Sequence, residues 1–268
     1  MDLRERQLAV DLGTKAAREA GALLLEYLER IDRVKLKRKS HTRDLVTEAD
    51  LASERLLVAQ LREAFPGHAI EAEEETCDPE SDQPRWFLDP LDGTVNYVHR
   101  LPFFCVSMGL YVGTKPQVAV VHAPLLGETF CAVLGGGAWM EGPRGSGKLA
   151  TSRVESLGEA VLATGFPYRR ESLENNNLGN FQELFCDLRG IRRMGSAALD
   201  LAYVAAGRLD GYWELHLAPH DVAAGALLVR EAGGIVSDAH GGEDWLRGGS
   251  VVAAGPGLQG QLQARIQA

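Results

Sequence analysis

Residues 86–94 read WFLDPLDGT and carry the side chains best suited to chemistry. Two carboxylates, Asp89 and Asp92, and the hydroxyl of Thr94 lie within six residues of one another. The apolar start predicts a buried strand that delivers both aspartates to its end, where a proline and a glycine turn the chain sharply. Asp, Pro and Gly are also the ordinary residues of turns, so the motif needs further acids beside it before it indicates a site.

Residues 71–82, just upstream, contain seven acidic side chains and no lysine or arginine. Most of such a run is normally a solvated face. However, the strand predicted from Ala69 would carry Glu73 or Glu74 to the cleft that holds Asp89. Carboxylates that meet there repel one another by several kcal/mol unless a cation lies between them. Oxygen ligands favour Mg²⁺, Mn²⁺ or Ca²⁺, and a site that must also accept phosphate oxygens favours Mg²⁺.

The backbone after Asp92 suits a phosphate group. Gly93 lets the backbone approach a ligand closely, and if a helical turn opens after Thr94, the amides of Gly93 and Thr94 point at an anion. The sequence has no G-x-S-x-G motif and no cysteine beside a plausible basic partner, so a metal-activated water is a better nucleophile than a side chain. These residues together predict a metal-dependent phosphate-ester site.

The spacing of apolar residues predicts the elements that must position these groups. Steps of three and four from Leu8 to Ile31 indicate a long helix, and a second amphipathic helix is expected from Asp50 to Ala64. Stretches rich in valine and aromatic residues then predict an antiparallel sheet in the first half of the chain. Its strands are expected at 69–73, 86–88, 103–112, 117–122 and 129–134.

From residue 161 onward, short strands alternate with helical segments, which predicts a second sheet covered by helices. Strands are expected at 161–164, 191–194, 211–215, 235–237 and 251–253, and helices at 173–188, 197–206 and 221–232. We therefore expect an α+β fold with an N-terminal half over 1–150, which carries the Asp89–Thr94 loop, and a C-terminal half over 151–268. The two halves should pack closely around a shared cleft.

Composition narrows the class of protein further. The 268 residues include 28 Lys and Arg against 37 Asp and Glu, a formal net charge of −9, which argues against a general nucleic-acid binder. No apolar stretch approaches the roughly 18–20 residues of a membrane helix, and the first residues do not resemble a secretion signal. We therefore expect a cytoplasmic protein that does not bind membranes. The four widely spaced cysteines are expected to be reduced thiols.

Two segments allow competing interpretations. The basic run at 33–43 favours a solvated hairpin over a nucleic-acid or membrane patch, because it is short, lacks aromatic residues and lies in an acidic chain. Residues 142–148 match the glycine and lysine positions of a nucleotide-binding loop. There, however, Leu149 stands where a Ser or Thr must bind Mg²⁺, and no helical pattern follows. We expect a glycine-rich hairpin turn at this place.

Several motifs, in a fixed order through most of the chain, resemble the inositol monophosphatase family of Mg²⁺-dependent, lithium-sensitive phosphatases. They are Asp44–Asp50 (DLVTEAD), Glu73–Glu74, Asp89–Thr94 (DPLDGT), Gly165–Tyr168 (GFPY), Gly195–Ala198 (GSAA) and Asp221–Gly225 (DVAAG). Any one of them alone would be a weak signal. The resemblance implies a layered αβαβα sandwich, a homodimer and two or three Mg²⁺ ions in each site.

Carried over by position, the resemblance also implies a set of metal ligands. Glu73, Asp89 and the carbonyl of Leu91 would hold one Mg²⁺. Asp89, Asp92 and Asp221 would hold a second, and Glu73 would also reach a third. Asp221 would be the contribution of the C-terminal half. Two cations of this kind activate the attacking water and neutralise the leaving alkoxide and the phosphoryl oxygens together.

The same resemblance implies catalytic and substrate-binding roles. Thr94, with Asp50 behind it, would orient the attacking water, and Glu73 would be catalytic with them. Lys37 falls where the family has a lysine near the metals, and Glu74 is a further candidate beside Glu73. The phosphate and the substrate hydroxyls would be met by Asp92, Gly93, Thr94, Gly195, Ser196, Ala197, Glu214 and Asp221.

One position departs from the family pattern. His220 stands where the family usually has a tryptophan before the metal aspartate. This exchange removes a large apolar wall and adds a group that titrates near neutrality, so it bears on the shape of the sugar pocket more than on the metal site. A lone histidine is more often structural than catalytic, and Glu214 could likewise be an ordinary surface acid at a strand end.

The expected activity is hydrolysis of a small polyol or sugar phosphate monoester, with myo-inositol monophosphate as the leading substrate. Fructose 1,6-bisphosphate, histidinol phosphate, nucleotide 3′-phosphates and NADP are the alternatives that related enzymes on this scaffold hydrolyse. Proline at the second position of the Asp89–Thr94 motif fits the sugar-phosphate and histidinol-phosphate enzymes better than the nucleotide branch. A regulatory binding protein that keeps the fold without depending on turnover is the non-enzymatic alternative.

Overall fold

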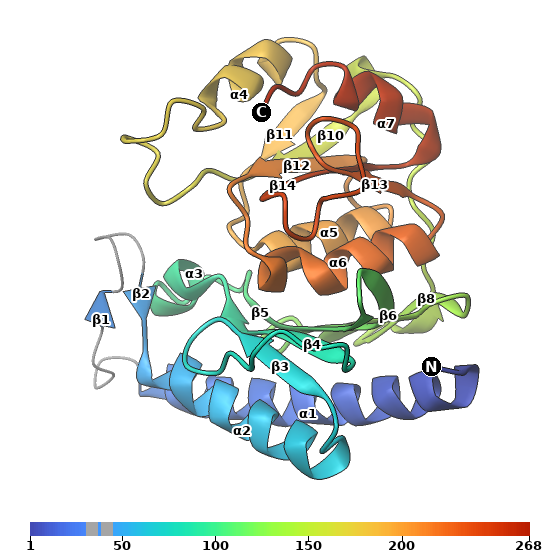
Figure 1. Ribbon diagram of the computed structural model, residues 1–268. Helices are drawn as coiled ribbons and strands as arrows, with labels where there is room; N and C mark the ends of the chain where they lie inside the picture. Colours follow the sequence, from blue (N-terminus) through green and yellow to red (C-terminus); the bar gives the residue numbers. More distant parts are fainter. Residues whose placement is uncertain (31–36, 39–44) are drawn as a thin grey trace.

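The structure, a computed structural model, describes the backbone of residues 1–30, 37–38 and 45–268, with side chains from 1–30 and 47–268. Five layers stack on one another (Figure 1). They are helices α1 (Leu3–Glu29) and α2 (Glu48–Ala64), a seven-stranded sheet, helices α5 (Ala197–Ala205) and α6 (Pro219–Glu231), a five-stranded sheet, and helices α4 (Leu178–Phe185) and α7 (Pro256–Gln263). The predicted αβαβα sandwich is confirmed.

The outer layer beneath the seven-stranded sheet is formed by α1 and α2. The long helix predicted from Leu8 is confirmed, and it begins earlier because Asp2 caps it in a capping box with Glu5. It ends at Glu29, and Ile31 lies outside the described residues. Small side chains let α1 lie close to the sheet, since a Cβ on Gly21 would come within 2.6 Å of the His122 ring. The buried residues on this face of α1 include Ala9, Ala16, Ala17 and Ala20.

The seven-stranded sheet has the order β3-β4-β5-β6-β7-β8-β9. Its strands are β3 (Ala69–Ala72), β4 (Arg85–Asp92), β5 (Cys105–Val112), β6 (Lys115–Ala123), β7 (Glu128–Val133), β8 (Gly137–Gly142) and β9 (Gly145–Lys148). The pairs from β4 to β7 are antiparallel, as predicted. The pairs from β7 to β9 are antiparallel too, although the sequence analysis did not predict β8 and β9 as strands. The prediction is wrong for β3, which pairs parallel to β4, because the connection over 73–84 is long enough to return the chain to the same end of the sheet.

Two short hairpins lie at positions that the sequence singled out. Strands β8 and β9 pair with Gly142 opposite Gly145, so the predicted glycine-rich turn at 142–148 is confirmed. Strand β1 (Lys37–Arg38) pairs antiparallel with β2 (Leu45–Val46), which agrees with a hairpin in the basic region. The rest of that run, Asp44 and the side chain of Lys37 lie outside the described residues.

The five-stranded sheet has the order β11-β10-β12-β14-β13. Its strands are β10 (Val161–Thr164), β11 (Gly190–Arg192), β12 (Gly211–Leu215), β13 (Ile235–Ser237) and β14 (Ser250–Ala254), and a 3₁₀ turn, η2 (Leu157–Glu159), precedes β10. The helix predicted over 173–188 is shorter than expected. It begins only after Asn177, which has a φ of +72° and whose buried side chain donates to the carbonyl of Gly165 at 2.7 Å.

The middle layer brings the two halves into close contact. A Cβ on Gly109 of β5 would lie 2.8 Å from the Cβ of Ala223 in α6, and one on Gly225 of α6 would lie 2.5 Å from Leu201 in α5. These close approaches pack α6 directly against β4, β5 and β6. The packing fixes the distance between the first turn of α6 and the seven-stranded sheet. Among the described helices, none is both long and apolar enough to cross a membrane.

Candidate active site

Glu73 and Asp89 meet because β3 and β4 run parallel. Ala72 at the end of β3 pairs with Leu88, and the backbone N–H of Glu73 donates to the carbonyl of Leu88 at 3.1 Å. Glu73 therefore leaves β3 at the level where β4 reaches Asp89. The side chain of Asp89 is only 2% exposed, in a strand that is buried along its whole length. The parallel pairing thus places two acids at one end of the sheet.

Strand β4 continues past Asp89 to Asp92 through an irregularity, so the turn that the sequence motif predicts comes at Gly93. The pairing of β4 with β5 shifts register between Asp89 and Asp92, and the N–H of Leu91 donates to Oδ1 of Asp89 at 3.0 Å. Gly93 has a φ of +93°, and a Cβ on it would lie 2.9 Å from the carbonyl oxygen of Phe103, so glycine is required on both grounds. The helical turn that the phosphate hypothesis needs follows directly as α3 (Thr94–Val98).

Asp221 reaches this turn from the other half of the chain. It lies in the first turn of α6, where its Oδ2 accepts the N–H of Ala218 at 2.6 Å. One carboxylate oxygen from each of Asp89, Asp92 and Asp221 lies within 4.8 Å of the other two. The structure therefore brings these three acids together, as the family resemblance implies for a metal site.

A second group of candidate ligands lies beside the first. Single ligand atoms of Glu73, Asp89 and His220 also lie within 4.8 Å of one another. Both groups line a pocket of about 310 Å³, together with the turn that follows Asp89. Asp89 belongs to both groups, so the two sets of donors share one carboxylate and could hold two neighbouring cations.

Burial and mutual repulsion make these acids poor anions in the absence of a cation. Burial, reinforced by Glu73, Asp92 and Asp221, raises the pKa of Asp89 well above its usual value. Burial and the charge of Asp221 raise the pKa of Asp92 to about 7, against the lowering effect of a hydrogen bond from Ser196. Both shifts mean that the ionised carboxylates are unfavourable here, first because they are buried and then because they repel one another.

The donor set fits a hard divalent cation. The first group offers only carboxylate oxygens, which suit Mg²⁺, Mn²⁺ and Ca²⁺. A cation between them would replace repulsion by attraction and return the buried carboxylates to their ionised form. Leu91, whose carbonyl is the further ligand implied by the family resemblance, lines the same pocket, and this carbonyl accepts the Thr94 hydroxyl at 3.1 Å.

Thr94 and Asp50 form a buried pair behind the turn. The Thr94 hydroxyl is 3.2 Å from Oδ1 of Asp50. Asp50 is the third residue of α2 and completes a capping box with Thr47. Burial raises the pKa of Asp50 to about 6, although hydrogen bonds from Thr47 oppose the shift. A hydroxyl held by a buried carboxylate can pass on a proton, which is the chemistry expected of this pair.

Helix α2 contributes two further residues that the sequence analysis did not single out. The carboxylate of Glu54, which is 1% exposed, accepts the backbone N–H groups of Glu74, Glu75 and Thr76 at 2.8–2.9 Å. The hydroxyl of Ser53 donates to the carbonyl of Pro90 at 2.9 Å. Glu54 therefore anchors the loop that carries Glu73. Its spacing of four residues from Asp50, on the same face of the helix, was the available signal.

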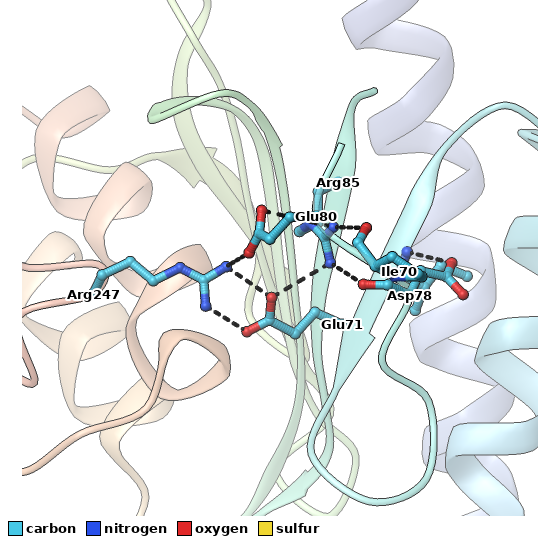
Figure 2. A network of polar contacts seen from close by, with 7 residues as sticks. Ile70, Glu71, Asp78, Glu80, Arg85 and Arg247 are labelled. Carbon is cyan, nitrogen blue, oxygen red and sulfur yellow. Dashed lines mark hydrogen bonds and ion pairs between the residues drawn. The ribbon is translucent and has the colours of Figure 1, made fainter. Parts of the chain in front are cut away.

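An ion-pair network ties the strand before Glu73 to the C-terminal half (Figure 2). Glu71 accepts two hydrogen bonds from Arg247, each at 2.8 Å, and lies 3.5 Å from Arg85. Arg247 also lies over the ring of Phe87, 5.2 Å from its centroid, and 3.3 Å from Glu80. Glu71 and Glu80 are thus structural partners of arginines rather than candidate metal ligands.

Asp92 connects the metal ligands to a second, smaller pocket of about 110 Å³. Its Oδ2 accepts the hydroxyl of Ser196 at 2.7 Å and the N–H of Ala198 at 2.8 Å, both at the beginning of α5. Gly195 precedes them with a φ of +92°, and a Cβ there would lie 2.7 Å from Nη1 of Arg193. Gly195, Ser196 and Ala197 line this second pocket, as the substrate-binding set requires.

Glu214 also lines the second pocket and is not a surface acid. It lies in β12, accepts a hydrogen bond from the hydroxyl of Tyr212, and burial raises its pKa to about 7. Gly165, from the Gly165–Tyr168 motif, packs directly against it, because a Cβ on Gly165 would lie 2.0 Å from Oε2 of Glu214. The glycine of that motif is therefore needed to make room for a carboxylate.

The sequence analysis missed two charged residues of the second pocket, Asp200 and Arg193. Asp200 is 2% exposed, and within the described part of the chain its Oδ1 makes no hydrogen bond. Burial and the nearby charge of Glu214 raise the pKa of Asp200 well above its usual value. Asp200 lies within the first turn of α5, four residues after Ser196, so helical spacing from the glycine-serine motif would have found it.

Two candidates predicted from the sequence, Glu74 and Lys37, are not among the described residues that line the pocket. Glu74 follows Glu73, but its carboxylate belongs to neither group of candidate ligands found among the described side chains. The backbone of Lys37 is in β1, and its side chain lies outside the described residues. His220, which departs from the family pattern, does line the pocket of the metal ligands.

The order of these motifs is that of a known family. A sequence model of the Inositol monophosphatase family matches residues 6–268. The chain belongs to the inositol monophosphatase family. It is 42% identical over 259 residues to a protein named Nus factor SuhB from Escherichia coli strain K12, which covers 96% of this chain and 95% of that protein.

Solved structures agree with the family assignment. Inositol monophosphatase from Anabaena (Nostoc) sp. PCC 7120 is similar with a TM-score of 0.85 and 38% identity, over 97% of this chain and 95% of that one. Extragenic suppressor protein suhB from Bartonella henselae is similar with a TM-score of 0.89 and 35% identity, over 96% and 98%. The fold and the phosphatase class predicted from the sequence are thereby confirmed.

Proposed function

We propose that this protein hydrolyses the phosphate monoester of a small polyol or sugar with Mg²⁺ as cofactor, and that myo-inositol monophosphate is the leading substrate. The observation that carries the proposal is the convergence of Asp89, Asp92 and Asp221 within 4.8 Å beside the buried Thr94–Asp50 pair. Three carboxylates this close repel one another unless cations lie between them. A proton acceptor beside them could take the proton of an attacking water, as hydrolysis requires.

Each group of residues has its own task in this proposal. Divalent cations bound by the carboxylates would supply Lewis acidity for the attacking water and for the phosphoryl oxygens. The amides of Gly93 and Thr94, which line the same pocket, would hold the phosphate. The Thr94 hydroxyl would orient the water and pass its proton towards Asp50, whose raised pKa of about 6 suits a proton acceptor near neutral pH. Glu73, which lines the same pocket, would hold a cation together with Asp89.

The second pocket supports a substrate with several hydroxyl groups. Asp92 lines both pockets, so a substrate whose phosphate lies at the metal ligands would extend towards Glu214 and the Gly195–Ala197 segment. Carboxylates accept hydrogen bonds from hydroxyl donors, and a polyol offers many such donors in a small volume. Fructose 1,6-bisphosphate, histidinol phosphate and NADP remain the alternatives for this pocket.

A panel of phosphate esters assayed with and without Mg²⁺ tests the proposal. We expect phosphate release from small polyol or sugar phosphates that depends on Mg²⁺ and falls by at least about a hundredfold in Asp89→Asn and in Asp221→Asn, because each removes a charge from the ligand set. Asp82→Asn, an exposed acid of the same run, is the matched control and should keep normal turnover. Equal rates without Mg²⁺, or no release from any ester, would refute the proposal.

The names of the relatives favour a second candidate, a binding role. The Escherichia coli relative is named as a Nus factor rather than for a reaction, which matches the regulatory alternative considered from the sequence. The variant Asp92→Asn distinguishes the phosphatase from the binding protein. If it loses phosphatase activity but still supports the function of the protein in the cell, the binding role is favoured. The homodimer and the lithium sensitivity expected from the family resemblance remain predictions, to be checked by light scattering and by inhibition with Li⁺.

A further inference from the structure

His220 offers a nitrogen donor where the surrounding ligands offer oxygen. A ring nitrogen of His220 and one carboxylate oxygen from each of Glu73 and Asp89 lie within 4.8 Å of one another. The side chain of His220 is 17% exposed, and its Nε2 is 3.9 Å from Oδ1 of Asp221. The imidazole therefore lies against both groups of candidate ligands instead of facing solvent.

Three other described histidines, His68, His122 and His216, hold their rings by hydrogen bonds, whereas His220 does not. Nδ1 of His68 accepts the indole N–H of Trp86 at 3.1 Å, and Nδ1 of His122 is 2.9 Å from the Thr129 hydroxyl. Nε2 of His216, which lines the same pocket as His220, is 2.6 Å from the carbonyl of Asn175. Within the described residues the ring of His220 makes no hydrogen bond. Its polar neighbour at 3.9 Å is Asp221, which is itself a candidate metal ligand.

We propose that His220 is a nitrogen ligand of the cation held by Glu73 and Asp89, and that it shifts this position from Mg²⁺ towards first-row transition ions such as Mn²⁺ and Co²⁺. The inference rests on the proposed function, because it concerns the same metal site. Imidazole binds transition ions well, while Mg²⁺ strongly prefers oxygen. Where the family usually has tryptophan, no such donor exists, so the shift is a property of this chain.

The position of His220 in the chain makes ligation mechanically reasonable. His220 and Asp221 are neighbours in the first turn of α6, which Pro219 begins. The helix start is rigid because Asp221 caps it through the N–H of Ala218, and close packing of α6 on the large sheet fixes its height. Two adjacent side chains on a rigid turn are therefore held beside Glu73 and Asp89 before any cation arrives, which reduces the entropic cost of binding.

Pulsed electron paramagnetic resonance of bound Mn²⁺ tests the proposal without a turnover measurement. We expect coupling to a directly bound ¹⁴N nucleus in the wild-type protein and its loss in His220→Gln. His216→Gln is the matched control, because it removes another imidazole from the same pocket, and it should keep the ¹⁴N signal. His220→Trp, which restores the residue usual in the family, should also lose the signal and provides a second variant should the glutamine protein fail to fold.

Calorimetric titrations of Co²⁺ and Mg²⁺ provide the second readout. In His220→Gln the affinity for Co²⁺ should fall by about tenfold or more, while that for Mg²⁺ should change by less than about threefold. Mn²⁺ binding without ¹⁴N coupling, or equal losses for Co²⁺ and Mg²⁺, would overturn the role of His220 and leave the proposed function standing. Failure of the wild-type protein to bind any of the three ions would overturn both.

Discussion

At the scale of single residues, Asp92 shows how one carboxylate can serve two purposes. Its Oδ2 accepts hydrogen bonds from Ser196 and Ala198 at the start of α5, and one of its carboxylate oxygens lies within 4.8 Å of oxygens of Asp89 and Asp221. Burial would favour its protonated form, and only a cation or a hydrogen-bond donor makes the ionised form acceptable. The ionised Asp92 carboxylate is thus unfavourable in the metal-free protein and favourable once a cation is bound.

The pH dependence of stability should reveal this cost. The pKa of Asp92 is raised from 3.8 to about 7 on folding. The folded state therefore binds the proton more tightly, and the metal-free protein should lose stability as the pH rises from about 4 to about 7, by an amount on the order of 3 kcal/mol. Denaturant unfolding of the wild-type protein and of Asp92→Asn, both without metal, measures the difference.

The variant should lose less stability over this range than the wild-type protein does. Mg²⁺ should stabilise the wild-type protein more at about pH 8 than at about pH 5.5, because protons compete with the cation for the same oxygens. Identical pH profiles for the two metal-free proteins would show that Asp92 does not carry the repulsion.

Gly165→Ala tests a second claim at this scale, that the Gly165–Tyr168 motif makes room for Glu214. A Cβ at this position would overlap the carboxylate of Glu214, so that side chain must move. We expect KM for a polyol phosphate to rise by roughly tenfold, with a smaller change in kcat, because substrate contacts and not metal ligands are displaced. Gly67→Ala is the control, since nothing lies within 4 Å of a Cβ there. Equal kinetics for both variants would contradict the packing argument.

At the scale of elements, helix α2 is the frame on which the metal loop is built. Asp50, Ser53 and Glu54 are all buried on one face, where they reach Thr94, the carbonyl of Pro90 and the amides after Glu73. Spacing of three and four residues brings such side chains to the same face of a helix. A single helix thereby fixes both the end of β4 with the turn that follows it and the loop after β3.

Removing the charge of Glu54 should disturb the metal site from a distance. Glu54→Gln replaces an acceptor of three N–H groups by an amide with only one oxygen. We expect a loss of about 1–3 kcal/mol of stability and a decrease of roughly tenfold in Mg²⁺ affinity, measured by denaturant unfolding and calorimetry. Glu63→Gln, an exposed position on the same helix, should leave both values near those of the wild type. Unchanged Mg²⁺ affinity in Glu54→Gln would rule out the anchoring role.

At the scale of the whole molecule, the site exists only where the two halves meet. Glu73, Asp89 and Asp92 come from the first half, and Asp221 and His220 come from the second. Besides the apolar middle layer, the contact between Arg247 and Glu71 links the halves on the side of β3 (Figure 2). This link lies two residues before Glu73, so it holds the strand that delivers the first metal ligand.

A double-mutant cycle measures this link. Arg247→Ala and Glu71→Gln should each lower the stability of the protein. The coupling energy between them should be about 1 kcal/mol, since Glu71 is mostly buried while Arg247 is 45% exposed. Denaturant unfolding of the wild-type protein, the two single variants and the double variant gives this coupling. Purely additive losses would mean that the two side chains do not stabilise each other.

The sequence by itself determined the order of the elements and the identity of the acids. Periodicity was sufficient for α1, α2 and most strands, because amphipathic patterns report directly which face of an element is buried. The turn in the DPLDGT motif and the role of Gly93 could also be predicted, since the residue preferences of turns are local. The helix predicted from 173 failed in its first residues because the conformation of Asn177 depends on its tertiary contacts with Gly165 and Trp213.

Apart from the family resemblance, which points to Glu73, Asp89, Asp92 and Asp221, only the tertiary structure decides which of these acids meet. Seven acids in the run over 71–82 look alike in sequence, yet the parallel pairing of β3 with β4 carries Glu73 to Asp89 and leaves Glu71 to two arginines. The roles of Glu54 and Asp200 and the nearness of His220 to Glu73 likewise depend on contacts between distant segments. The local sequence pattern determines how each segment folds. The pairing register between segments is set by packing across the whole core, and this register decides which acidic side chains lie close together.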